Sequence, residues 1–161
     1  MATFGRTSED TNDTTYGSTY IWGHKFTISE EGDTSSISAY IYRWAAVNVQ
    51  MAIYTDDAPP AKVASSATVQ NTTGYSWVTA DITANLPAGD YWLCICSASD
   101  VYGKYATSDE VFYRQTGTYG TWPDTLASWT AYANGIMDIY CTYDPAGGGE
   151  ESNVLYMLFE S

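Results

Sequence analysis

The sequence predicts an all-β fold, and three observations carry this prediction. The helix-favouring residues Leu, Glu, Lys and Gln are scarce, whereas Thr, Tyr, Ser, Val, Ile and Trp, which suit the half-buried surface of a sheet, dominate the chain. Apolar and polar residues alternate with a period of two in many short runs. Gly, Pro, Asp and Asn separate these runs as turn residues. About eight to ten short strands at this spacing are typical of an antiparallel β-sandwich.

The alternating pattern places the elements along the chain. In the run at 35–43 and the residue that follows it, Ile and Ala residues share one face, and Tyr40, Tyr42 and Trp44 occupy the other. Pro59 and Pro60 interrupt the pattern, because proline has no N–H to donate to a neighbouring strand. The runs expected as strands are 19–28, 35–43, 47–55, 75–82, 90–97 and 135–143, with shorter candidates at 110–115 and 130–133. Only 100–104 and 124–128 have a pattern compatible with a helical turn.

Composition divides the chain into four segments. Residues 1–15 are rich in Thr, Ser, Asp and Asn and are expected as a loosely held lead-in to a sandwich domain at 16–143. Residues 144–152 contain three consecutive glycines and are typical of a flexible linker. Residues 153–161 form an apolar, strand-prone C-terminal arm. The arm either completes the chain's own sandwich or pairs with the sheet edge of another subunit. Its assembly residues are Val154, Leu155, Tyr156, Met157, Leu158 and Phe159.

The charge balance excludes two classes of partner. The chain has 6 Lys and Arg against 19 Asp and Glu, a net charge of −13. Such a field repels phosphate, so neither nucleic-acid binding nor docking on anionic lipid is expected. The longest apolar windows are far shorter than the ~20 residues that span a bilayer, so membrane insertion is not expected. No apolar run follows Arg6, and a secretory signal is therefore not expected.

Catalytic and metal-binding patterns are also missing from the sequence. The single histidine, His24, neighbours Trp22 and Phe26 on one strand face and is interpreted as a structural residue. There is no Gly-x-Ser-x-Gly motif and no Cys-x-x-Cys pair. Most acids lie in expected turns, with 9–13 and 109–110 as the alternatives for a calcium site. We expect no enzyme activity, no cofactor and no metal. Cys94, Cys96 and Cys141 are expected as buried thiols, with one bridge from Cys141 to either of the others as the alternative.

The aromatic residues carry the positive functional signal. The chain contains 6 Trp and 15 Tyr, more than a core of this size requires. Flat rings stack on sugars, and they also anchor protein–protein contacts. The alternative is that the rings only cap the sandwich. Two sets are candidates for a contact surface: Tyr40, Tyr42 and Trp44 on one strand, and Tyr119, Trp122, Trp129 and Tyr132 in a Gly- and Thr-rich region at 116–134.

Several short motifs occur in an order that resembles a known class of domains. They are Phe4-Gly5-Arg6-Thr7, Phe26-Thr27-Ile28-Ser29-Glu30, Ile37-Ser38-Ala39-Tyr40-Ile41, Ala52-Ile53-Tyr54-Thr55-Asp56 and Leu86-Pro87-Ala88-Gly89-Asp90-Tyr91-Trp92-Leu93. Together they resemble the jelly-roll-like β-sandwich domains of tailed-phage structural proteins and prokaryotic surface proteins, which are similar to carbohydrate-binding modules. The resemblance spans most of 4–143. It implies a jelly-roll-like antiparallel β-sandwich and no catalytic residues.

Two functions remain on this reading of the sequence. The first is a non-enzymatic structural or binding module of a surface assembly, either a virion component (phage head decoration or tail) or an extracellular filament subunit. Its partners would be further copies of itself in a homo-oligomer or other assembly proteins, at the virion or extracellular surface. The alternative is a carbohydrate-binding module that stacks glycans on its loop aromatics. A stable oligomer favours the first function, and a monomer retained on a polysaccharide favours the second.

Overall fold

The computed structural model describes residues 1–147, and within them every regular element is a β-strand. The all-β prediction is confirmed, and all strand pairs are antiparallel. The arm at 153–161 and most of the linker lie outside the described residues. The thirteen strands are β1 (Ala2–Gly5), β2 (Asn12–Tyr16), β3 (Tyr20–Ile28), β4 (Gly32–Arg43), β5 (Asn48–Thr55), β6 (Lys62–Ser65), β7 (Val69–Gln70), β8 (Gly74–Asp81), β9 (Asn85–Leu86), β10 (Gly89–Ser97), β11 (Val101–Thr116), β12 (Thr130–Met137) and β13 (Ile139–Pro145).

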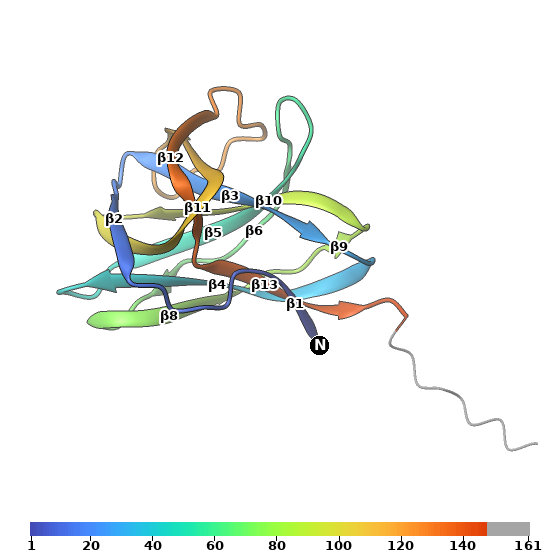
Figure 1. Ribbon diagram of the computed structural model, residues 1–161, viewed down its shortest axis with the longest axis horizontal. Helices are drawn as coiled ribbons and strands as arrows, with labels where there is room; N and C mark the ends of the chain where they lie inside the picture. Colours follow the sequence, from blue (N-terminus) through green and yellow to red (C-terminus); the bar gives the residue numbers. More distant parts are fainter. Residues whose placement is uncertain (148–161) are drawn as a thin grey trace, which may run out of the picture.

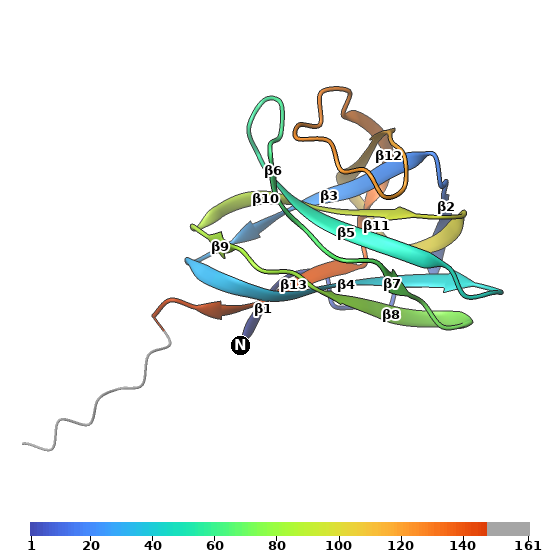
Figure 2. The same cartoon turned by 180° about the vertical axis from the view of Figure 1, so that it is seen from behind.

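The strands form one hydrogen-bonded sheet whose main path runs β1-β13-β4-β11-β3-β10-β5-β6. Figures 1 and 2 show that this sheet folds over into two layers. The lower layer holds β1, β13 and β4, with β8 and β9 paired to the other side of β4. The upper layer holds β3, β10, β5 and β6. The long strand β11 joins the layers, because its first part pairs with β4 and its last part pairs with β3. The jelly-roll connectivity implied by the resemblance stays a prediction.

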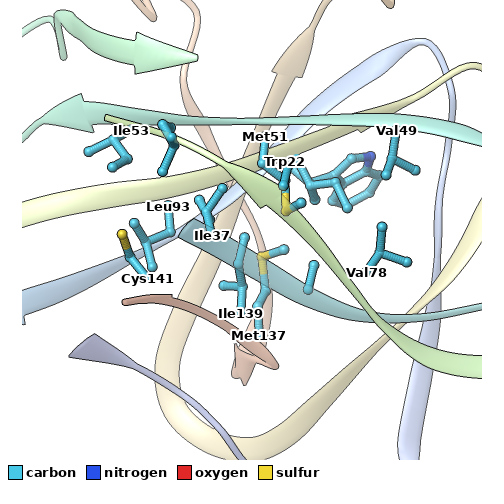
Figure 3. Packing of buried hydrophobic residues seen from close by; sticks show 14 of the residues in the cluster. Trp22, Ile37, Val49, Met51, Ile53, Val78, Leu93, Met137, Ile139 and Cys141 are labelled. Carbon is cyan, nitrogen blue, oxygen red and sulfur yellow. The ribbon is translucent and has the colours of Figure 1, made fainter. Parts of the chain in front are cut away.

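The main core lies between the two layers. Ile37 and Ile139 of the lower layer lie across from Met51 and Leu93 of the upper layer (Figure 3), and each is fully buried. Burying one such side chain stabilises the fold by about 1.5–3 kcal/mol. The alternation expected for β4 is confirmed, because Ile37, Ala39 and Ile41 are buried while Tyr40 and Tyr42 are only partly buried.

The expected strands are present, with two differences near the N-terminus and in the middle of the chain. Residues 1–15 are not a loose lead-in, because β1 pairs with β13 and the polar strand β2 pairs with β11. Residues 100–104 form no helical turn and instead begin β11. This strand is possible because Gly103 has no side chain: a Cβ atom there would lie 1.8 Å from the ring of Tyr16.

Two further boundaries move near the C-terminal end of the sheet. The run at 135–143 divides at Asp138 into the end of β12 and the start of β13. The sheet also extends into the expected linker, since Pro145 pairs with Gly32 and the backbone N–H of Ala146 donates to Glu31 at 2.8 Å. Residues 124–128 contain no helical turn; they hold the bridge partner of Ala61 and run close to β6.

Candidate functional site: two aromatic surfaces

The outer face of the lower layer carries a row of aromatic side chains, which we call the aromatic platform. The register of β4 with its two neighbours brings these rings together. Tyr40 lies opposite Trp77 of β8, and Tyr42 lies opposite both Tyr75 of β8 and Tyr102 of β11. Alternation directs these side chains away from the core, because their neighbours along β4 are buried between the layers. The platform consists of Tyr40, Tyr42, Trp44, Tyr75, Trp77, Tyr102 and Tyr140.

Ring contacts make the platform continuous. The ring centroids of Tyr42 and Tyr75 are 4.5 Å apart, and those of Tyr40 and Trp77 are 5.2 Å apart. Trp44 stands nearly perpendicular to Tyr42, at 82° and 5.0 Å. Edge-to-face pairs at these distances stabilise aromatic clusters by about 0.5–1.5 kcal/mol each beyond their burial. The first predicted set, Tyr40, Tyr42 and Trp44, therefore lies together on one surface.

A pocket of about 430 Å³ opens among these rings. Its walls are Tyr42, Trp44, Tyr75 and Tyr102, and the carboxylate of Asp13 also lines it. Trp44 is 71% exposed and Tyr75 is 43% exposed, so the rim of the pocket is open to solvent. The pocket can hold a flat, amphipathic group between aromatic walls, with a carboxylate oxygen available as a hydrogen-bond acceptor.

Charges beside the platform are compensated within the chain. The ammonium of Lys104 lies 4.2 Å from the Tyr75 ring and 3.4 Å from Asp13, and it donates to the carbonyl of Thr11 at 3.0 Å. The hydroxyl of Tyr75 donates to Asp13 at 2.9 Å. Burial raises the pKa of the Tyr75 phenol, so this hydroxyl stays neutral at physiological pH. The platform thus presents neutral rings and a paired carboxylate, although the whole chain is strongly acidic.

The segment between β1 and β2 fastens the platform to the sheet. The indole N–H of Trp77 donates to Glu9 at 3.1 Å. The next residue, Asp10, donates its backbone N–H to the carboxylate of Asp138 at 2.8 Å, and Arg6 lies between the two carboxylates. The side chain of Asp138 is fully buried, and this burial raises its pKa to about 7. The hydrogen bond from Arg6 lowers the pKa of Asp10, so the two acids differ in charge state near neutral pH.

A second aromatic group lies on the outer face of the upper layer, and the loop at 117–129 covers it. We call it the roofed cluster. Its buried members are Ile21, Ala52, Tyr54, Trp92, Cys94, Cys96 and Leu126, and Tyr113, Tyr119, Trp122 and Trp129 pack against them. Three residues of the second predicted set, Tyr119, Trp122 and Trp129, are therefore partly buried against a small core of the upper layer. None of the three is an exposed ring on an open surface.

Backbone and side-chain contacts hold the loop over this face. The hydroxyl of Tyr54 donates to the carbonyl of Pro123 at 2.7 Å, and the ammonium of Lys62 donates to the carbonyl of Trp122 at 3.1 Å. Gly23 makes room for the roof, because a Cβ atom there would lie 2.7 Å from the sulfur of Cys94 and 2.9 Å from the Trp129 ring. A groove of about 650 Å³ remains beside the loop, between Trp92, Trp129 and residues 56–60.

Tyr132 is separated from the other three residues of its set. It lies on β12, where its ring meets Trp22 at 4.8 Å and the guanidinium of Arg114 at 4.2 Å. The sequence interpretation grouped the four by proximity along the chain. The loop carries Tyr119, Trp122 and Trp129 over the upper layer, whereas Tyr132 returns to a strand.

The single histidine and the cysteines are buried. His24 is 2% exposed and its Nε2 atom lies 3.0 Å from Glu110, while burial lowers the pKa of the imidazole. Cys94 and Cys96 belong to the roofed cluster and Cys141 belongs to the main core, so they lie on opposite sides of the upper layer and all three are free thiols. Within residues 1–147 no three His, Cys, Asp or Glu side chains converge as a metal site. The same residues include no helix long and apolar enough to cross a membrane.

Sequence reasoning missed four members of the platform: Tyr75, Trp77, Tyr102 and Tyr140. The alternation of Tyr75 and Trp77 was a usable signal, since residues two apart on a strand share a face. The pairing of β8 with β4 that brings them beside Tyr40 and Tyr42 has no local signal. No family model, no curated protein and no solved structure matches the chain, so the surfaces are interpreted from their own geometry.

Proposed function

We propose that the protein is a non-enzymatic binding module of a surface assembly and that the aromatic platform is its contact face. The observation that carries this proposal is the exposure of Trp44 and Tyr75 on the outer face of the sheet, beside charges that the chain itself compensates. Tyr and Trp dominate the energetics of protein interfaces, whose central residues carry few net charges. Contiguous exposed apolar surface on a soluble domain marks an interaction site.

The assembly is a virion, with the chain as a head decoration or tail component, or an extracellular filament. This part of the proposal rests on the resemblance to jelly-roll-like domains of phage and prokaryotic surface proteins. The partner is a second copy of the chain or another assembly protein. The proposal includes no catalytic step, cofactor or metal. It accordingly places the chain at a virion or extracellular surface.

Light scattering of the purified full chain tests the assembly function. A stable oligomer is expected, and Tyr75→Ser should shift it towards the monomer. Tyr132→Ser is the matched control, because Tyr132 is 42% exposed, nearly equal to Tyr75, but lies away from the platform. A wild-type chain that stays monomeric over the concentration range, or equal effects of the two substitutions, would count against this function.

A second candidate function is glycan binding, and the pocket of the platform favours it. Sugar C–H groups carry slight positive charge and stack on the negative faces of aromatic rings. Here Tyr42, Trp44, Tyr75 and Tyr102 supply such rings around a pocket, and Asp13 supplies an acceptor for hydroxyl groups. Migration in native gels containing soluble polysaccharides tests this function. Retardation of a monomeric wild-type chain, lost in Trp44→Ala and kept in Tyr132→Ser, would favour glycan binding over assembly.

A further inference from the structure

The strand β8 forms an open edge of the lower layer. It pairs with β4 along all eight of its residues, Gly74 to Asp81, without any shift in register. Among residues 1–147, no strand pairs with its other side. An edge strand presents a row of N–H and C=O groups that can pair with another extended segment.

This edge lacks the features with which proteins protect such strands. Lys side chains, proline, bulges and short length all discourage pairing at an edge. The β8 sequence has neither Lys nor Pro, and its one charged residue is Asp81 at the end. By contrast, β1 has only four residues, and β6 is bulged and covered by the loop through the hydrogen bond from Lys62 N–H to Asp124. The unprotected geometry of β8 is what a site for strand addition requires.

Both faces of the edge carry apolar side chains, together with Thr79 and Asp81 on the outer face and Ser76 on the inner face. On the inner face Val78 and Ala80 are buried at the rim of the main core, and on the outer face Tyr75 and Trp77 belong to the platform. A strand added beside β8 would therefore contact apolar neighbours on both of its faces.

We propose that the edge of β8 binds residues 153–159 of this chain as an added antiparallel strand. The six residues that follow Asn153 are all apolar, so an extended segment would carry Val154, Tyr156 and Leu158 on one face and Leu155, Met157 and Phe159 on the other. The segment 153–159 is one residue shorter than the eight-residue strand β8. The inference goes beyond the proposed function, because it names the docking edge and holds whether the segment comes from the same copy or from a neighbouring one.

The position of the C-terminal end of the sheet allows the docking. Pro145 pairs with Gly32, and Gly32 pairs on its other side with Leu86 of β9. A strand beside β8 would lie three strand spacings, about 14 Å, to the side of β13. As an antiparallel strand it would begin beside Asp81, which pairs with Ser36, so it is also displaced by four residues, about 13 Å, along β4 from Gly32. The two offsets together make roughly 19 Å. Residues 146–152 span up to roughly 23–25 Å when extended. The connection is long enough to reach the edge within one copy or to cross to an adjacent copy.

Amide hydrogen exchange of the full chain and of a chain ending at Gly147 tests the proposal. Those β8 amides that face away from β4 should exchange about tenfold or more slowly in the full chain, because only there do they have a partner. Amides that face β4 should be equally protected in both proteins. The amides of β1 and β6 serve as internal controls and should not change.

Adding a synthetic peptide of residues 150–161 to the shortened chain should restore the protection of β8. A peptide with Tyr156→Pro and Leu158→Pro should not, because proline removes the backbone donors. If the shortened chain does not fold, the same two substitutions in the full chain replace it. Unchanged exchange of β8, or new protection on β1 or β6 in its place, would overturn the proposal.

The concentration dependence of the protection separates this inference from the proposed function. Protection that rises with oligomer formation supports both the docking edge and the assembly function. Protection of β8 in a chain that stays monomeric supports the docking edge and counts against assembly. Oligomers without protection of β8 support assembly through the platform and overturn the docking edge.

Discussion

The two outer faces of the molecule carry the same kinds of residue but differ in what lies above them. On the lower layer, the platform is open and Trp44 is 71% exposed. On the upper layer, Trp92 is 6% exposed because the loop at 117–129 returns over it. A Tyr- and Trp-rich strand face thus becomes either a binding surface or a second core, depending on whether a later segment of the chain covers it.

The comparison also separates two ways of stabilising a surface. The roofed cluster is held by apolar packing together with a few bonds from side chains to the loop backbone, such as Tyr54 to Pro123. The platform is held by polar contacts from the segment between β1 and β2, through Glu9 and Asp10. Substitutions in the roofed cluster should therefore change stability, whereas changes at the platform should affect binding and pH dependence.

The largest effect is expected for Trp92→Ala in the roofed cluster. Removing a buried Trp side chain leaves a cavity and costs about 3–5 kcal/mol of unfolding free energy. Chemical denaturation measures this loss. A loss below about 1 kcal/mol would mean that the loop does not pack on this face in solution, and the contrast with the platform would disappear.

Gly23→Ala should give the next largest effect. The added Cβ would press on the Cys94 sulfur and the Trp129 ring, and overpacking of this kind costs about 1–3 kcal/mol. Gly17→Ala is the matched control, because its Cβ would meet the nearest ring atom at an ordinary 3.5 Å. Tryptophan fluorescence and denaturation together report the outcome. Equal stability of the two variants would contradict the close contact of the loop with β3 at Gly23.

The platform side should show a pH dependence that originates at Asp138. The pKa of this buried acid is raised from 3.8 to about 7 in the folded protein, so the stability it contributes is fully present below pH 4 and is lost as the pH rises towards 7. Relative to Asp138→Asn, the wild type should gain unfolding free energy as the pH falls from 8 to 5, by at most about 1.4 kcal/mol per pH unit.

The difference in unfolding free energy between the wild type and Asp138→Asn isolates the contribution of Asp138. The lowered pKa of buried His24 acts in the opposite direction, since its contribution to stability is present above pH 6.5 and is lost as the pH falls below that value, but it is present in both proteins. Denaturation of each protein at four or five pH values provides the measurement. A difference that is constant across this range would show that Asp138 does not titrate there.

The smallest effect on stability is expected for Trp44→Ala. With 71% of this residue already in solvent, the unfolding free energy should change by no more than about 0.5 kcal/mol. Oligomer formation or glycan retention should nevertheless weaken strongly. A variant that is as stable as the wild type and also binds equally well would remove Trp44 from the contact face.

Local pattern was enough to predict the all-β class, most strand positions and the outward set of Tyr40, Tyr42 and Trp44, because alternation along a strand directly specifies its faces. The pairing of β8 with β4 was not predictable, since it joins residues more than thirty positions apart that carry no shared signal. The covering of Trp92 by the loop at 117–129 was not predictable for the same reason, because it also joins segments that are distant in the sequence. Asp138 was missed because one acid between two strands looks like any other turn residue until its burial is known.

The position of the cysteines means that the chain contains its own markers of local opening. Thiol reagents attack the thiolate, and burial raises the pKa of Cys96 and of Cys141 to about 12 and that of Cys94 well above its usual value. Each sulfur should therefore react only when its surroundings open. Cys94 and Cys96 lie beneath the loop, and Cys141 lies between the layers. If Cys94 and Cys96 react faster than Cys141, the loop opens more often than the two layers separate. The two reaction rates would then measure these two opening events separately.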